Sequence, residues 1–436
     1  MRAVIMLRSA CLAMLCLFPL SSARGQLEFE SPPINYGEAH SHDAIAKLQQ
    51  QLDAGKAELA WDDEHGYLKA VLAALDISPS TQMLVFSKTS FQLPRISPKL
   101  PRAIYFNDDV YIGWVQNGDV IEVSATDPEL GAVFYTLAQR DSEPPKFVRD
   151  RGQCLTCHAS SRTEGVPGHL IRSVYSSASG MPIFGSGTYR TTQASPFEQR
   201  FGGWYVTGTH GVARHMGNVL ATEREPEQLD REAGANLTDL SPLVDVEPYL
   251  EPHSDLIALM TLTHQAEMHN WITRANFETR LALHSSAIMN EMLDRPADYQ
   301  SESTQRRIER AAEQLLECML FVKEEPLAAP LAGTSGFAET FAARGPFDSQ
   351  GRSLRQFDLK TRLLKFPCSY LIYSEAFLKL PPAVKLRVYT RLDEILTGRS
   401  RADSFEKPAA ADCAAIREIL LETHPELAAA WQPKSE

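Results

Sequence analysis

The stretch CLTCH, residues 154–158, holds the residues of this chain that are best suited to chemistry. Two thiols stand three positions apart, and an imidazole follows the second one directly. This arrangement suits three kinds of site, namely covalent attachment of haem, binding of zinc and thiol–disulfide exchange. In the haem site, Cys154 and Cys157 form thioether bonds to the vinyl groups, and His158 is the proximal iron ligand.

The rest of the sequence helps to decide between these three kinds of site. Zinc needs four ligands, usually supplied by a second paired motif, and the other cysteines of the chain after residue 23 are isolated at Cys318, Cys368 and Cys413. Thiol exchange is typical of a βαβ unit, and the preceding stretch PPKFVRDRGQ does not have the pattern of its strand. The motif therefore favours one covalently bound haem c.

The motif resembles the attachment site of c-type cytochromes, with Cys154, Cys157 and His158 at the three positions of that family. The following GVPGHL, residues 165–170, is similar to the turn after the motif in small cytochromes c. By this resemblance, the carbonyl of Pro167 accepts the N–H of His158 and fixes its tautomer. Two longer stretches, GGWYVTGTHGVARHMGN and FPCSYLIYSEAF, resemble large, exported, single-haem proteins with a cytochrome c domain and no assigned reaction. This second likeness implies a single covalent haem and export but no mechanism.

The second axial position of the iron decides between functions. A strong side-chain ligand there makes an electron carrier, whereas an open position permits catalysis or gas binding. One group of candidates lies 52 to 58 residues after His158 in THGVARHMGN, and a second lies on a predicted helix, where two candidates four positions apart share one face. The candidates are His210, His215 and Met216 in the first group, and His264 and Met268 in the second. An open or water-bound iron remains an alternative.

Haem propionates need cationic partners. Four arginines, Arg172, Arg190, Arg200 and Arg214, lie within sixty residues of the motif in an otherwise acidic chain. Guanidinium groups suit carboxylates because they donate two parallel hydrogen bonds. Arg172, Arg190 and Arg214 are therefore candidate propionate partners.

The first residues predict export. A positive start with Arg2 and Arg8 precedes an apolar stretch and small residues, so we expect a signal peptide that is cleaved after Ala23. Its removal takes away two arginines and no acids, which changes the formal net charge from −12 to −14. Such an acidic chain is not suited to binding nucleic acid, and no later segment is apolar enough to span a membrane. We expect the bacterial periplasm as the location and a basic-faced redox protein as the partner.

The remaining pattern predicts an α+β fold. Two helical segments and a run of short aromatic and β-branched strands occupy residues 24–148, and the haem-binding segment, residues 149–225, is irregular with further short strands such as GGWYVTGTH. Residues 245–436 are mostly helical. The sequence predicts these three regions after the signal peptide, residues 1–23.

Two functions follow from these residues and their spacing. The first is a periplasmic single-haem c-type cytochrome that transfers electrons. The second is a haem enzyme of the peroxidase or oxidase type with an open distal site, which the length of the chain favours because a carrier needs only about a hundred residues. A third possibility, from a different class, is a sensing or docking part of a larger assembly.

Overall fold

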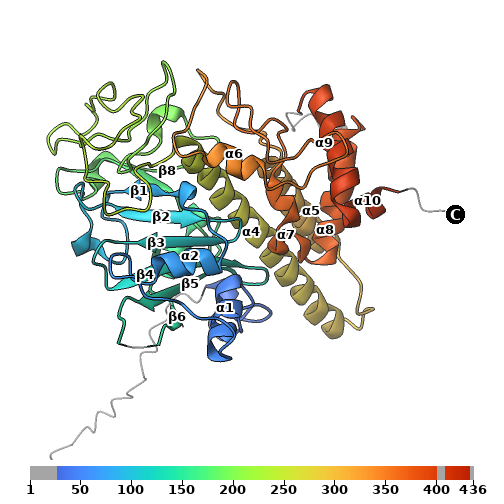
Figure 1. The fold of residues 1–436 in the computed structure, drawn as a ribbon. Helices are drawn as coiled ribbons and strands as arrows, with labels where there is room; N and C mark the ends of the chain where they lie inside the picture. Colours follow the sequence, from blue (N-terminus) through green and yellow to red (C-terminus); the bar gives the residue numbers. More distant parts are fainter. Residues whose placement is uncertain (1–26, 143, 400–407, 433–436) are drawn as a thin grey trace, which may run out of the picture.

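The computed structural model describes residues 27–142, 144–399 and 408–432, and the predicted signal peptide lies outside them. Figure 1 shows a sheet in the first half of the chain and helices in the second half. The predicted α+β class, with a β-rich N-terminal part and a mostly helical C-terminal half, is confirmed. The division at residues 148, 225 and 245 remains a prediction.

Six antiparallel strands form the sheet, each paired with the next in sequence order. In the long strand β4, alternate residues such as Ile121 and Val123 are buried on one face, while Glu122 and Ser124 point to the other. This alternation explains why the strands were recognisable in the sequence. The strands are β1 (Met83–Val85), β2 (Arg102–Phe106), β3 (Val110–Trp114), β4 (Val120–Asp127), β5 (Gly131–Ala138) and β6 (Phe147–Arg149).

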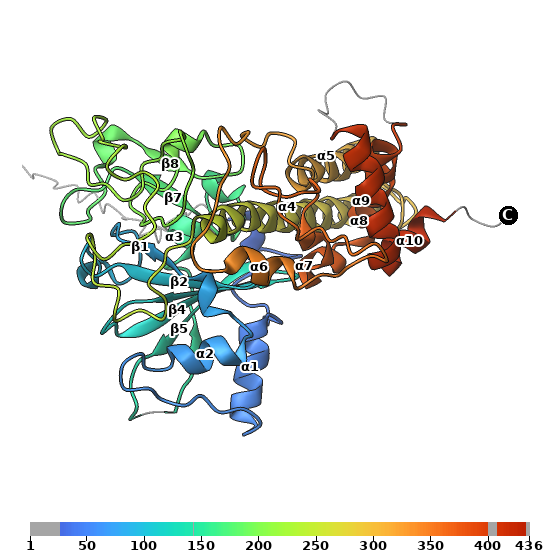
Figure 2. The same ribbon diagram turned by 45° about the horizontal axis from the view of Figure 1, so that its top comes forward.

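The two faces of the sheet have different covers. Helices α1 (Ala44–Asp53) and α2 (Leu68–Ala74) pack on one face. Figure 2 shows the single-turn helix α3 (Leu155–His158) and the hairpin of β7 (Arg172–Val174) and β8 (Thr188–Arg190) on the opposite side. The second face therefore carries the cysteine motif.

The helical half is built around the 37-residue helix α4 (Leu256–Met292), whose first half is buried between the sheet and the other helices. No helix in the described ranges is long and apolar enough to cross a membrane. The other helices are α5 (Glu302–Met319), α6 (Phe337–Ala342), α7 (Glu375–Leu378), α8 (Pro382–Leu396), α9 (Ala410–Thr423) and α10 (Pro425–Trp431). Short 3-10 helices lie at Glu28–Glu30, Pro79–Thr81, Leu93–Arg95, Ser161–Thr163, Phe184–Ser186, Phe197–Gln199 and Tyr370–Tyr373.

Two stretches, one within the predicted haem-binding segment and one directly before the cysteine motif, differ from the sequence-based expectation. The stretch GGWYVTGTH does not form a strand, because the positive φ angles of Gly203 (85°) and Gly208 (149°) break the extended backbone. Its residues instead form single bridges to three separate partners, Val85, Asp255 and Ala332. Conversely, the stretch PPKFVRDRGQ before the motif, which does not have the pattern of a strand, contains the edge strand β6, and β6 pairs with β5.

The start of α4 offers a test of this arrangement. One carboxylate oxygen of Asp255 accepts the N–H groups of Ile257 (2.8 Å) and Ala258 (3.0 Å), and the other accepts those of Thr334 (2.6 Å) and Ser335 (2.9 Å). We expect Asp255→Ala to lower the free energy of unfolding by about 3 kcal/mol, because it removes a helix cap and leaves buried donors unpaired. Urea unfolding measures this loss.

The matched control is Ser301→Ala at the start of α5. The Ser301 hydroxyl accepts the N–H of Thr304 at 3.2 Å and shares a hydrogen bond with the Thr304 hydroxyl at 3.0 Å, in a partly buried setting. We expect a loss of about 1 kcal/mol there. Equal losses in the two variants would contradict the role assigned to Asp255.

Candidate functional site

The cysteine motif forms one helical turn directly after β6. The Asp150 carboxylate starts the turn by accepting the N–H groups of Gly152 (2.9 Å) and Cys154 (3.0 Å). The Cys154 carbonyl then accepts the N–H groups of Cys157 (3.1 Å) and His158 (3.0 Å). Positions three and four apart on a helical turn share a face, so both thiols and the imidazole belong to the same side of α3.

The imidazole of His158 is held by a single hydrogen bond. Its Nδ1 lies 3.0 Å from the carbonyl oxygen of Gly168, which can only accept, so Nδ1 carries the proton. The lone pair is therefore on Nε2, for which the described residues supply no hydrogen-bond partner. The ring also packs against Phe134 of β5, with 4.8 Å between the ring centroids, and burial lowers the pKa of His158. Neutral imidazole with a free Nε2 is the form that binds a metal.

The resemblance assigned this hydrogen bond to the carbonyl of Pro167, and that assignment is wrong by one residue. The Pro167 carbonyl accepts the N–H of Ala132 in β5, at 3.0 Å. The N–H of Gly168 donates to the His158 carbonyl, at 2.8 Å. This bond brings the Gly168 carbonyl beside the imidazole of His158.

The thiols do not have the environment of an exchange site. Burial raises the pKa of the half-buried Cys154 to about 12, and the Asp150 carboxylate adds to this effect. Reactive thiols need a lowered pKa, so this environment disfavours thiol exchange. Three potential metal ligands come together in the described ranges only at Asp62, Glu64 and His65, away from the motif, so zinc finds no complete ligand set at the cysteines.

The sheet beside the motif has a strip of side chains without a complete cover. Five residues in register across β2 to β6 form this strip, which we call the open row: Ile104, Gly113, Glu122, Thr136 and Val148. All except glycine are half-buried or exposed, although they lie on a face that is buried elsewhere. Phe134, against which His158 packs, lies two residues from Thr136 on the same strand, or about 7 Å. The open row therefore adjoins the imidazole.

A second histidine, His169, lies on the same face of the sheet. Its Nδ1 is 3.1 Å from the hydroxyl of Ser124, and its Nε2 is 3.0 Å from the hydroxyl of Thr126. The side chain of Asn270 in α4 holds its backbone, because Oδ1 accepts the His169 N–H and Nδ2 donates to the His169 carbonyl, both at 2.8 Å. Sequence reasoning missed this clamp, since α4 lies about a hundred residues further along the chain.

Of the candidate distal histidines, His210 and His264 use both ring nitrogens in hydrogen bonds, whereas His215 uses only one. His264 hydrogen-bonds Gln193 and Ser369, both at 2.8 Å, inside the core of the helical half. His210 uses Nδ1 to donate to the Ala213 carbonyl (2.8 Å) and Nε2 to accept the Asn236 N–H (2.9 Å). His215 is buried next to His210, with Nδ1 accepting the Gly217 N–H at 3.0 Å and Nε2 unpaired.

The candidate distal methionines are buried as well. Met216 lies 3.6 Å from the hydroxyl of Ser173, measured from its sulfur. Met268 is buried in the core around α4. None of the five candidate distal ligands shares a hydrogen bond or ring contact with His158 in the described part of the chain.

The three candidate arginines also differ in availability. Arg190 pairs with Glu164 and lies 3.9 Å from Glu267, and Arg214 pairs with Glu232 at 2.6 Å. Arg172 donates to the hydroxyl of Thr188 and lies over the ring of Phe184, without a carboxylate partner among the described residues. Of these arginines, Arg172 is the one that remains available.

Comparisons with known proteins do not extend this description. No family model, curated protein or solved structure matches the chain. The geometry at the motif therefore carries the functional argument.

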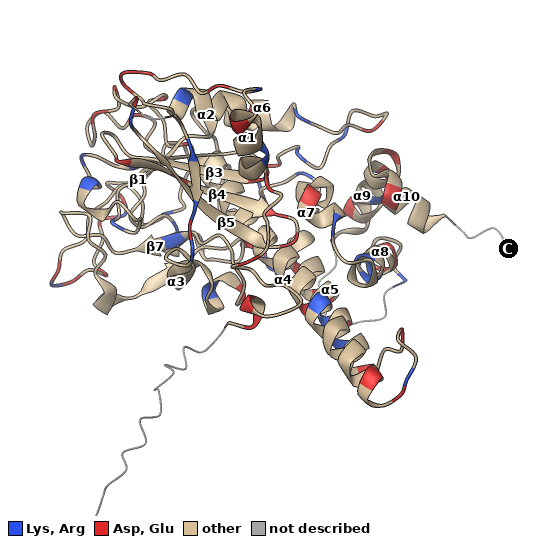
Figure 3. Cartoon of the chain, turned by 90° about the horizontal axis from the view of Figure 1, so that it is seen from below, with Lys and Arg blue, Asp and Glu red and all other residues tan. Residues whose placement is uncertain are grey.

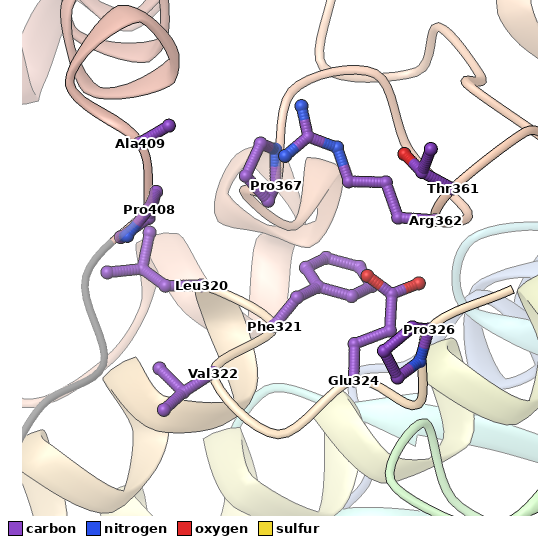
Figure 4. Close-up of a pocket in the computed structure, with 10 residues that line it drawn as sticks. All are labelled: Leu320, Phe321, Val322, Glu324, Pro326, Thr361, Arg362, Pro367, Pro408 and Ala409. Carbon is purple, nitrogen blue, oxygen red and sulfur yellow. The ribbon is translucent and has the colours of Figure 1, made fainter.

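Two pockets lie away from the motif. A cavity of about 270 Å³ in the helical half is lined by Phe321, Glu324 and Arg362 among others (Figure 4). Arg362 is already paired with Asp412, at 2.7 Å. Neither this cavity nor a second one of about 370 Å³ between α2 and α6 includes a residue of the motif.

Gly168 offers a test of the histidine geometry. A Cβ atom at this position would lie 2.3 Å from Oδ1 of Asn270 and 3.0 Å from Cβ of Thr163. We expect Gly168→Ala to lower the free energy of unfolding by about 1–3 kcal/mol, because the added methyl group displaces the clamp on His169. The same shift moves the carbonyl that orients His158.

The control for this variant is Gly185→Ala. No atom lies within 4 Å of a Cβ built at Gly185, so the free energy of unfolding should change little. Thermal or urea unfolding of both variants measures the difference. A fully stable Gly168→Ala variant would show that the contact with Asn270 is not restrictive.

Proposed function

We propose that this chain binds one haem c covalently through Cys154 and Cys157 and transfers electrons through it. The observation that carries the proposal is the single turn of α3, which places both thiols and the imidazole on one side. The Gly168 carbonyl accepts a hydrogen bond from the Nδ1–H of His158, which leaves the lone pair of Nε2 free to bind a metal. A bound haem would supply one-electron redox chemistry.

The chain itself would hold and orient this group. Asp150 fixes the start of the turn, and Phe134 supports one face of the imidazole, so the ligand atom has one defined direction. Hydrogen bonding of Nδ1 to a carbonyl also raises the basicity of the ligand. These contacts fix the tautomer and the orientation of the imidazole, as the partners of metal-binding histidines do.

We also propose export to the periplasm and a basic-faced redox partner. The formal net charge, −12 for the full sequence and −14 after cleavage at Ala23, supports such a partner through long-range attraction, which raises association rates. Figure 3 shows acidic and basic residues mixed along α5, so the acid excess is not gathered on that helix. We therefore attribute the proposed attraction of the partner protein to the net charge of the chain and not to α5.

A second candidate function is a haem enzyme of the peroxidase or oxidase type. The observation that favours it is that four of the five candidate distal side chains are hydrogen-bonded or packed elsewhere, while His215, whose Nε2 is unpaired, shares no hydrogen bond or ring contact with His158. An iron with one protein ligand would keep an open position for a small molecule.

One experiment tests both functions. The full chain is produced together with a bacterial system for c-type haem attachment, and covalent haem is detected by intact-mass measurement. Absorption spectra are then recorded in the oxidised and reduced states, before and after addition of carbon monoxide. A low-spin spectrum that carbon monoxide does not change supports the carrier. A high-spin spectrum that carbon monoxide shifts supports the enzyme, and absence of covalent haem would overturn both.

A further inference from the structure

We propose that Arg102 binds a haem propionate and that the open row is the surface over which the haem lies. This inference rests on the proposed function, because it assumes that haem is attached at α3. Arg102 was not among the arginines that the sequence indicated. The assignment of Arg102 rests on the strand pairing, on its hydrogen bonds and on the exposed apolar side chains around the open row.

The guanidinium of Arg102 is only partly used. Its Nη1 donates to the Glu122 carboxylate at 2.7 Å, with both side chains mostly buried. Its Nε–H is buried without an acceptor, and no described residue accepts from Nη2. A buried donor without a partner costs about 1–3 kcal/mol. A ligand carboxylate at this place would supply the missing acceptor.

The strand β3 lets Arg102 reach the open row. Gly113 stands between Ile104 of β2 and Glu122 of β4, and it has no side chain. The Arg102 stem passes there, with Cδ only 3.5 Å from the position that a Cβ of Gly113 would occupy. The guanidinium therefore lies beside the open row.

This ion pair is close to the cysteine motif. Glu122 pairs in register with Thr136, two residues from the Phe134 ring on which His158 packs. A haem bound to the two cysteines would thus reach Arg102 with its carboxylate edge.

Exposed apolar side chains surround the same area. Phe91 is 65 % exposed and follows Ser90, whose hydroxyl donates to Glu122 at 3.0 Å. Phe184 is 61 % exposed and lies under the guanidinium of Arg172. Arg172 is the first residue of β7, and Figure 3 shows β7 beside α3. Val148 of the open row is exposed as well. Grouped exposed apolar residues of this size mark binding surfaces, and a flat apolar ring system with carboxylates suits this one.

The competing arginines are less suitable. Each of Arg102, Arg190 and Arg214 pairs with a glutamate, but Arg190 faces two of them, Glu164 and Glu267, and the partner of Arg214, Glu232, is exposed to solvent. Arg172 has no such partner and remains available for the second propionate. Arg190 also has a buried donor without an acceptor, its Nη2, but that nitrogen lies 3.9 Å from a second carboxylate, that of Glu267, whereas Arg102 faces only the carboxylate of Glu122 among the described residues.

The test compares two variants that each remove one positive charge, Arg102→Gln and the control Arg214→Gln. Both are matured with haem, and their midpoint reduction potentials and covalent haem yields are measured. We expect Arg102→Gln to lower the potential at least three times as much as the control, because a nearby cation disfavours the ferric state. We expect Arg102→Lys to restore most of the shift.

A further variant keeps the test decisive if Arg102→Gln does not fold. Glu122→Gln removes the competing carboxylate and should raise the potential. Equal shifts for Arg102→Gln and the control, or an unchanged potential in Glu122→Gln, would overturn this inference alone, since haem would still be attached. A wild-type chain without covalent haem would overturn the proposed function, and this inference with it.

Discussion

Alanine in place of both Cys154 and Cys157 is expected to abolish covalent haem binding by the matured protein. Either single replacement should keep one thioether bond and therefore some covalently bound haem. The reason is that both thiols lie on the same helical turn as His158, whose Nε2 has no hydrogen-bond partner among the described residues. Extraction with acidified solvent followed by intact-mass measurement separates covalent from loosely held haem.

The controls are Cys318→Ala and Cys368→Ala, which replace buried thiols of the helical half. Burial raises the pKa of Cys368 to about 12, so this thiol stays protonated and enclosed. Both control variants should bind haem in the wild-type amount. Full haem attachment in the double variant at residues 154 and 157 would refute the role of the motif.

Acidification is expected to destabilise the protein strongly between pH 7 and pH 5. Burial lowers the pKa of His215 and His264 to about 3 and that of His269 to about 4. In the unfolded chain these histidines take up protons below about pH 6.5, whereas in the folded chain they remain neutral. The unfolded state then binds more protons, so the free energy of unfolding falls as the pH falls, by about 2 kcal/mol for each histidine over this range.

A buried carboxyl group acts in the opposite direction. Burial raises the pKa of Asp109 to about 7, so its folded form binds a proton more readily than its unfolded form and offsets about 2 kcal/mol. We expect a net loss of about 3–4 kcal/mol, measured by urea unfolding at pH 7, 6 and 5.

The variant His264→Gln isolates one contribution to this slope. It removes one titrating group from the core and should make the loss between pH 7 and pH 5 smaller by about 2 kcal/mol. Its stability at pH 7 is a separate quantity and does not affect the slope. An unchanged slope would show that His264 is not held neutral by the fold.

Local pattern was sufficient for much of the fold. The alternation of buried and half-buried residues in β4 and the helical spacing in α4 both depend on neighbours in the sequence. The strand β6 was missed because its three residues are too few to show a period. The stretch with Gly203 and Gly208 was misread because its β-forming residues are interrupted by positive φ angles.

The candidate site could likewise be predicted from the sequence only in part. The residues of the motif are adjacent in the sequence, so Cys154, Cys157 and His158 could be found there. The contact between Arg102 and Glu122 depends on the register of three strands, and no local pattern contains that information. The alternation within β4 does place Glu122 on the face opposite to Ile121, and that signal was present in the sequence.

The long helix α4 has a consequence for how the molecule unfolds. Its 37 residues extend over about 55 Å, and its first half shares one core with both the sheet and the helices that follow. Neither half of the chain can lose its packing without exposing α4 to water. We therefore expect calorimetry to record a single cooperative transition, in which the sheet with its cysteine turn and the helical half melt together.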